Sequence, residues 1–169
     1  ENDEASWEEV GLQDGLMLYK KEVSGSSLVA FKGEGIINAP MSRVFSVMVD
    51  YPRGVEWIDH LVEYRMIRWL SQNEFLTYSH VNTPFIIKDR DFLTYAKITV
   101  DKANRALVFN TKSVADPTVP ETKYVRAHLN FGRYILKPVE KGTKTLLTAE
   151  FHVDPRGSIP KWIVNLFQK

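Results

Sequence analysis

The sequence lacks cysteine altogether among its 169 residues. Disulfide bonds, thiolate nucleophiles, cysteine-bound zinc and iron–sulfur clusters are therefore excluded. It also lacks any run of roughly 18 consecutive apolar residues, the length that a membrane-spanning helix needs, and no signal peptide is visible. The four histidines, His60, His80, His128 and His152, include no pair at metal-ligand spacing. We accordingly expect a soluble protein with no metal and no cofactor.

Neither sign of charge is in excess, since 22 Lys and Arg stand against 21 Asp and Glu, a formal net charge of +1. Proteins that bind nucleic acid usually carry a basic surface, so nucleic acid is not an expected partner. A length of 169 residues with 44% hydrophobic composition fits one domain, residues 1–169, and we expect a monomer. The chain begins at Glu1, which leaves two expectations for its location: export after removal of an N-terminal signal, or the cytoplasm.

Hydrophobic periodicity divides the chain into strands and two helices. Residues 16–23 and 28–38 alternate on either side of a Ser/Gly turn, which predicts a hairpin. Apolar residues at helical spacing from Met41 predict a helix that ends or kinks at Pro52, and the same spacing from Ile159 predicts a closing amphipathic helix. Six further strands are predicted between the two helices, at 61–70, 74–82, 91–101, 105–113, 124–138 and 144–153.

The last two predicted strands can be placed in register. A two-residue turn at Lys141-Gly142 puts Arg133 opposite Glu150, a pair that favours solvent. The opposite face is more apolar and is predicted to point inward: Asn130, Gly132, Tyr134 and Leu136 against Leu147, Ala149, Phe151 and Val153. We expect an α+β fold in which a curved antiparallel sheet wraps around the terminal helix, with a void beside the small or polar inward residues Gly132, Ala149, Asn130 and His128.

Three motifs resemble the StAR-related lipid transfer (START) domains, and the resemblance spans nearly the whole chain. They are Tyr51-Pro52 with Glu56-Trp57, the charged run 88–92 (KDRDF), and the segment 152–165 (HVDPRGSIPKWIVN). The resemblance implies a helix-grip fold of the Bet v 1-like superfamily, which holds one lipid or sterol-like molecule in an internal hydrophobic cavity without chemistry. Certain sterol-binding members carry a facing acidic and basic residue where this chain has Ser79 and Ala96. The terminal helix, ending at Lys169, is also shorter than the family's.

On this resemblance the inward-facing positions become candidate ligand-binding residues. A cavity wall and a solid core share the same periodicity, so the pattern alone does not separate them. We expect the terminal helix and residues 83–88 to move when ligand enters. The candidates are Tyr64, Met66, Ser79, Thr94, Ala96, Val108, His128, Asn130, Tyr134, Leu147, Ala149, Phe151, Ile163 and Phe167.

Two other functions remain open. One is a cyclase- or hydratase-like enzyme on the same fold, with Tyr64, His128 or Tyr134 as acid or base. The other is a ligand-sensing module that recruits a protein when loaded. The sequence has no Gly-x-Ser-x-Gly motif and no Cys, so we expect no catalysis and instead the binding and intermembrane transfer of one hydrophobic ligand.

Two further features bear on the expected transfer. Arg90 lies between Asp89 and Asp91, and a charged cluster before a strand favours an anchor for a loop over a ligand-binding cation. Phe85, Ile86 and Ile87 form an apolar trio that either touches a membrane transiently or folds back as core.

Overall fold

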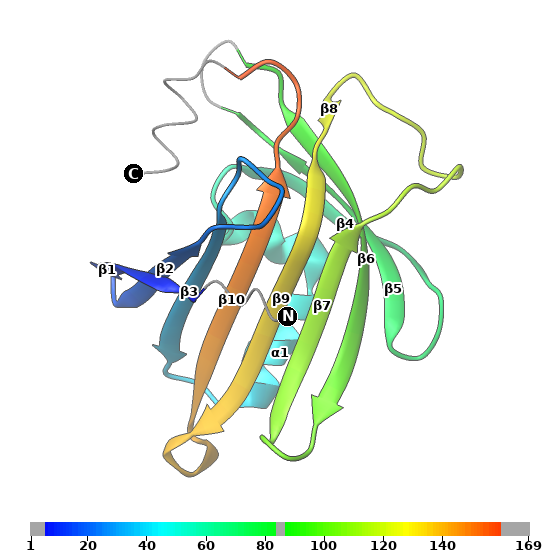
Figure 1. Ribbon diagram of the computed structural model, residues 1–169. Helices are drawn as coiled ribbons and strands as arrows, with labels where there is room; N and C mark the ends of the chain where they lie inside the picture. Colours follow the sequence, from blue (N-terminus) through cyan, green and yellow to red (C-terminus); the bar gives the residue numbers. More distant parts are fainter. Residues whose placement is uncertain (1–5, 84–86, 160–169) are drawn as a thin grey trace.

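The protein forms one open, curved, ten-stranded sheet with a helix against one face (Figure 1). The structure is a computed structural model and describes residues 6–83 and 87–159. The strands lie in the order β1-β2-β3-β10-β9-β7-β6-β5-β4, with β8 beside β6. Their bounds are β1 Glu8–Gln13, β2 Leu16–Lys21, β3 Ala30–Ile37, β4 Leu61–Trp69, β5 Glu74–Val81, β6 Arg90–Asp101, β7 Ala106–Ser113, β8 Val125–Arg126, β9 His128–Val139 and β10 Lys144–Asp154.

Two helical segments connect β3 to β4. Helix α1 (Met41–Val49) begins after Pro40, and its buried Val44 faces the sheet. Pro52 then stands at the start of the 3-10 helix η1 (Tyr51–Glu56), where its missing N–H costs nothing. A second 3-10 turn, η2 (Glu140–Gly142), joins β9 to β10. Helix α1 covers only part of one face of the sheet, which we call the inner face (Figure 1).

The predicted register of the last hairpin is confirmed over most of its length. Arg133 pairs with Glu150, and Tyr134 pairs with Ala149. Beyond His152 the pairing shifts, because Val153 lies opposite Leu129 and Asn130 has no partner on β10. An extra residue of this kind is a β-bulge, which reverses the expected alternation for the residues that follow.

The covered part of the inner face is closely packed. Val44 of α1 lies against Phe109 and Leu136, and Leu136 is fully buried. Phe45 of α1 stacks at a tilt on Phe109, with ring centroids 5.8 Å apart. Further partly buried residues complete this cluster, among them Leu147 and Tyr134. We call this region the packed half of the inner face.

The α+β class, the early hairpin, the helix at Met41 and the predicted strands are confirmed. Two details differ. The run 124–138 is interrupted at Ala127, so that β8 pairs in parallel with β6 before β9 begins. Strand β1 lies before the predicted hairpin and pairs antiparallel with β2. The predicted terminal helix lies outside the described residues, and among those described no helix is long and apolar enough to cross a membrane.

Candidate ligand-binding site

Above the packed half, the inner face borders a cavity of about 260 Å³. Phe109 and Tyr134 belong both to the packed cluster and to the cavity wall, so they form its floor. We call the residues around the cavity the hollow half of the inner face. The described residues that line it are Met48, Asp50, Tyr51, Gly54, Trp57, Ile58, Leu61, Tyr64, Phe75, Thr77, Ser79, Val81, Phe92, Thr94, Ala96, Phe109, Thr111, Leu129, Tyr134, Phe151 and Val153.

Three tyrosines from different elements meet in the wall. Tyr51 comes from η1, Tyr64 from β4 and Tyr134 from β9. The rings of Tyr51 and Tyr64 lie 4.7 Å apart, and the ring of Tyr134 meets that of Phe151 edge-on at 5.2 Å. Burial raises the pKa of all three phenols, and neighbouring tyrosines raise the pKa of Tyr51 and Tyr134 further. All three therefore stay protonated at neutral pH and act as hydrogen-bond donors.

Threonine hydroxyls form a band across the neighbouring strands. The Oγ1 atoms of Thr77 on β5 and Thr94 on β6 lie 2.7 Å apart, and Thr111 on β7 also lines the cavity. The Thr77 hydroxyl also opposes the rise in the pKa of Tyr64. The polar surface of this cavity thus consists mostly of uncharged hydroxyl groups.

The structure brings six of the predicted site residues to the cavity wall. They are Tyr64, Ser79, Thr94, Ala96, Tyr134 and Phe151. Met66 and Leu147 instead pack in the apolar clusters beside the cavity, and Ala149 lies opposite Tyr134 without reaching the wall. Ile163 and Phe167 lie outside the described residues.

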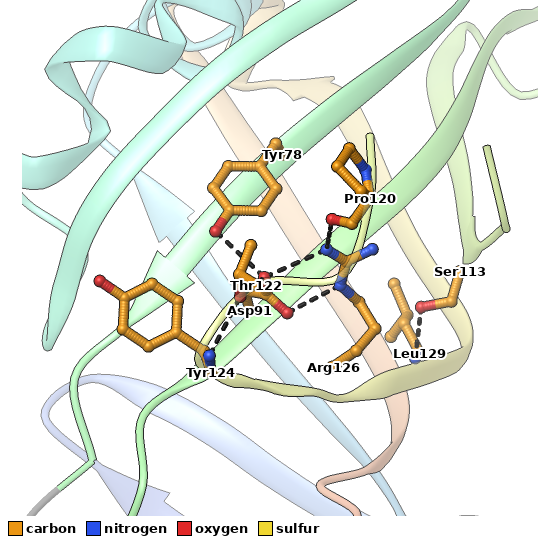
Figure 2. A network of polar contacts seen from close by, with 8 residues as sticks. All are labelled: Tyr78, Asp91, Ser113, Pro120, Thr122, Tyr124, Arg126 and Leu129. Carbon is orange, nitrogen blue, oxygen red and sulfur yellow. Dashed lines mark hydrogen bonds and ion pairs between the residues drawn. The ribbon is translucent and has the colours of Figure 1, made fainter. Parts of the chain in front are cut away.

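Three predicted site residues point away from the cavity. Val108 is wrongly placed in the prediction because its neighbour Phe109 is the inward residue of β7. His128 and Asn130 are wrongly placed because the bulge at Asn130 turns Leu129 inward, leaving Asn130 exposed on the outer side. The N–H of Leu129 donates to the Ser113 hydroxyl at 2.8 Å, so the bulge leaves this group satisfied (Figure 2).

The prediction also missed residues of the wall. Thr77 shares its side of β5 with Ser79 and was available from the same alternation. Leu129 gave no such signal, because only the bulge brings it inward. Tyr51 and Trp57 were noticed as part of a motif but not as parts of a wall.

Gly132 does not leave the expected void. A Cβ atom added there would lie 2.4 Å from Thr111 Oγ1 and 3.2 Å from Leu129 Cδ2. The missing side chain of Gly132 allows the Thr111 side chain to approach the backbone closely. The space for ligand lies elsewhere along the wall.

Polar contacts fasten the loops at the end of the hollow half. Arg90 is buried, and its guanidinium donates to the carbonyl oxygens of Lys88, Pro155 and Arg156. The neighbouring Asp89 accepts from the N–H of Thr83 at 3.0 Å and contacts His80 Nε2 at 2.7 Å. The interpretation of Arg90 as a loop anchor is confirmed by these contacts. Phe85 and Ile86 lie outside the described residues, and Ile87 is partly buried.

Asp91 is the centre of a second network on the outer side of the sheet (Figure 2). Its carboxylate is fully buried and accepts from Arg126 Nε at 2.7 Å, from the Thr122 hydroxyl at 2.7 Å and from the Tyr78 hydroxyl at 3.1 Å. Burial raises the pKa of Asp91, but these hydrogen bonds outweigh it and hold the pKa below its usual value. Burial and the Asp91 charge raise the pKa of Tyr78 to about 12. The network ties the 114–127 connection to β5 and β6.

The wall is suited to holding a molecule. Among residues 6–83 and 87–159, no three His, Asp or Glu side chains group as metal ligands would. His128, one of the three predicted acid–base residues, lies outside the wall, and the other two are the protonated Tyr64 and Tyr134. What remains is an apolar cavity with hydroxyl groups around its floor, the usual composition of a small-molecule site.

Curated proteins resemble this chain along nearly its whole length. Uncharacterized protein PA1579 of Pseudomonas aeruginosa is 29% identical over 164 residues, which cover 95% of this chain and 78% of that protein. Human StAR-related lipid transfer protein 7, mitochondrial, is 24% identical over 173 residues, which cover 98% of this chain and 46% of that protein. The chain thus spans less than half the length of this second relative.

Solved structures share the fold. Human STARD10 superposes with a TM-score of 0.84 at 24% identity, covering 98% of this chain and 68% of that chain. The Zhui aromatase/cyclase from Streptomyces sp. R1128 is more distant, with a TM-score of 0.50 at 16% identity over 76% of this chain and 70% of that chain. At such identities the likeness concerns the fold alone. The model of the START domain family matches residues 1–169, and the chain therefore belongs to the START domain family.

Proposed function

We propose that this domain reversibly binds one lipid or similar hydrophobic molecule in the cavity and carries it between membranes. The observation that carries the proposal is the cavity itself, which lies between the packed half and the anchored loops and has a mainly apolar wall. Membership of a family named for lipid transfer supports the same function. The proposal treats the protein as a monomeric carrier and not as an enzyme.

The energetics of such binding are adequate. Burying one acyl methylene contributes about 0.8 kcal/mol, so a chain of about ten methylenes offsets a substantial cost of ordering the ligand. Aromatic wall residues such as Phe75 and Phe92 offer large apolar surfaces for these contacts.

Transient membrane contact is part of the proposal. Trp57 lines the cavity, yet 55% of its surface is exposed. The same side chain therefore faces both the ligand cavity and the solvent. Tryptophan suits the boundary between membrane and water, because its ring is apolar and its N–H is polar. Val55 and Val62 are exposed apolar residues near it in the sequence.

The test is to fill the cavity and measure binding. Ser79 lines the wall, so Ser79→Trp should abolish the uptake of a fluorescent lipid and its transfer from donor to acceptor vesicles, while Tm stays unchanged. Asn110→Trp is the matched control, because Asn110 is exposed on the outer side and should change neither. Undiminished binding by Ser79→Trp would place the ligand elsewhere. A loss of stability of about 1–3 kcal/mol would instead identify a packed site.

The natural ligand can be sought directly. Mass spectrometry of organic extracts from purified protein should detect a lipid with the wild type and much less of it with Ser79→Trp. Equal lipid in both extracts would mean that it is bound outside the cavity.

A further inference from the structure

The cavity wall has almost no charge. Of the described residues that line it, only Asp50 has a carboxyl group, and Asp50 is exposed. Three arginines near the wall in the sequence are already engaged: Arg53 with Glu56, Arg65 with Glu63, and Arg90 with three carbonyl oxygens. None of the described residues that line the cavity is Lys, Arg or His.

The hydroxyl groups follow one another across neighbouring strands, from β5 through β6 and β7 to β9. Thr77 and Thr94 pair on neighbouring strands, Thr111 follows on β7, and Tyr134 lies at the floor beside Phe109. Tyr51 and Tyr64 approach from the side of η1 and β4. We call the six residues Tyr51, Tyr64, Thr77, Thr94, Thr111 and Tyr134 the hydroxyl belt.

Apart from the Ser79 hydroxyl, which lies beside Phe92, the remaining wall is apolar toward the anchored loops. Val81 is the last residue of β5, Phe92 lies near the start of β6, and Val153 lies near the end of β10. Leu129, brought inward by the bulge, completes this apolar end. A lipid in the cavity thus meets most of the hydrogen-bonding groups on the hydroxyl belt and a mainly apolar surface toward the loops.

Such a wall discriminates between polar groups by their charge. Hydroxyls donate and accept hydrogen bonds, so they can satisfy an alcohol, ester or amide. A buried phosphate or carboxylate needs a paired cation, and an unpaired charge in an apolar site is strongly disfavoured. The negative charge of Asp50 adds repulsion for an anion and none for a neutral group.

We propose that the cavity selects a lipid whose polar part is uncharged, and that this part lies on the hydroxyl belt with its hydrocarbon directed toward the anchored loops. The inference rests on the proposed function, because it names the class of ligand for the same cavity. Tyr134 is the residue expected to donate to the ligand, since it lies in the floor of the cavity with its ring against Phe151 and carries one of the hydroxyls of the belt.

The experiment compares two fluorescent ligands that differ only at the polar end. They are cis-parinaric acid and the alcohol obtained by reducing its carboxyl group, titrated at about pH 8, far above the ordinary carboxyl pKa of about 4. The alcohol should bind at least about tenfold more tightly than the ionised acid, and lowering the pH should narrow the gap by neutralising the acid.

Two matched variants locate the polar end. Tyr134→Phe keeps the ring against Phe151 and removes only the hydroxyl, so affinity for the alcohol should fall about fivefold, as expected for one hydrogen bond. Tyr95→Phe removes a hydroxyl from the other side of the sheet, where Tyr95 bonds Glu74, and should leave binding unchanged. Thermal unfolding of both variants checks that they are folded.

Every outcome decides one of the two proposals. If the wild type binds neither ligand, the proposed function fails. Equal or tighter binding of the acid would show that the cavity accepts an anion and would overturn the inference while the function stands. The same holds if Tyr134→Phe binds the alcohol as the wild type does, because the polar end would then lie away from the belt.

Discussion

The packed half and the hollow half of the inner face belong to the same sheet but are held together differently. In the packed half, α1 places Val44 and Phe45 against Phe109 and Leu136, so apolar contact holds the strands in place. In the hollow half no helix fills the space among the described residues, and the surrounding loops are fastened by polar contacts of Arg90 and Asp91. A sheet can therefore keep a cavity on one part of a face if its rim is anchored separately.

The loops fastened by Arg90 and Asp91, which form the anchored rim of the hollow half, should be the region whose substitution lowers stability most. Asp91→Ala leaves Arg126 without its partner and removes the acceptor of Tyr78 and Thr122. The expected loss is about 3–5 kcal/mol in the free energy of unfolding, the usual result of breaking a buried pair. Urea denaturation measures it. Glu56→Ala is the control, because it removes the pair with Arg53, in which both side chains are exposed, and should have a much smaller effect. Equal losses would mean that Asp91 is no special anchor.

The packed half should respond to a cavity-creating substitution. Leu136 is fully buried, so Leu136→Ala should cost about 3 kcal/mol while the affinity for lipid, measured well below Tm, stays the same. Leu129→Ala in the hollow half should cost less, because its side chain already borders a cavity, and should weaken lipid binding. The contrast between the halves disappears if the two variants lose the same stability and the same affinity.

The contact between Gly132 on β9 and Thr111 on β7 should contribute less to stability than the two regions above. Gly132→Ala would bring Cβ to 2.4 Å from Thr111 Oγ1, so the threonine must shift and we expect a loss of about 1–2 kcal/mol. Gly33→Ala is the matched control, because its Cβ would meet only Leu18 at an ordinary 3.6 Å. Thermal or urea unfolding compares the two. A neutral Gly132→Ala would show that Thr111 is free to rotate away.

The smallest expected effect is a pH dependence of the rim. Because the folded-state pKa of Asp91 lies below its unfolded value, its stabilisation is complete above about pH 4 and is lost as the pH falls through the folded value. Asp91→Asn removes this contribution, so its unfolding free energy should decline less steeply on acidification than that of the wild type. If the unfolding free energies of the wild type and Asp91→Asn fell in parallel on acidification, other carboxylates would determine the acid sensitivity.

Much of the fold followed from short-range patterns. The Lys141-Gly142 turn and the alternation on either side fixed the pairing of Arg133 with Glu150. Helical spacing located α1, and Pro52 its end. Strand β1 was missed although Asp14-Gly15 is a strong hairpin signal, and both residues have positive φ in the β1–β2 turn. The six residues of β1 include only two large apolar side chains, so their pattern did not predict a strand.

The site was less accessible to prediction. Tyr64, Ser79 and Tyr134 could be placed by alternation, since their strands continue regularly there. Alternation assigns a residue to a face but does not say whether a helix fills the space above it. Leu147 and Phe151 were therefore both predicted to contact ligand. Because α1 covers one part of the face, Leu147 packs in the core while Phe151 lines the cavity.

The bulge at Asn130 has a consequence for changes in chain length. Strand β9 carries one residue more than the opposite part of β10 requires. Deleting Asn130 would remove the irregularity and still leave Leu129 facing the ligand, whereas deleting a residue between 132 and 138 would turn the whole following segment over. Insertions and deletions along this strand are therefore unequal, and position 130 is where the wall can shorten without exchanging its lining.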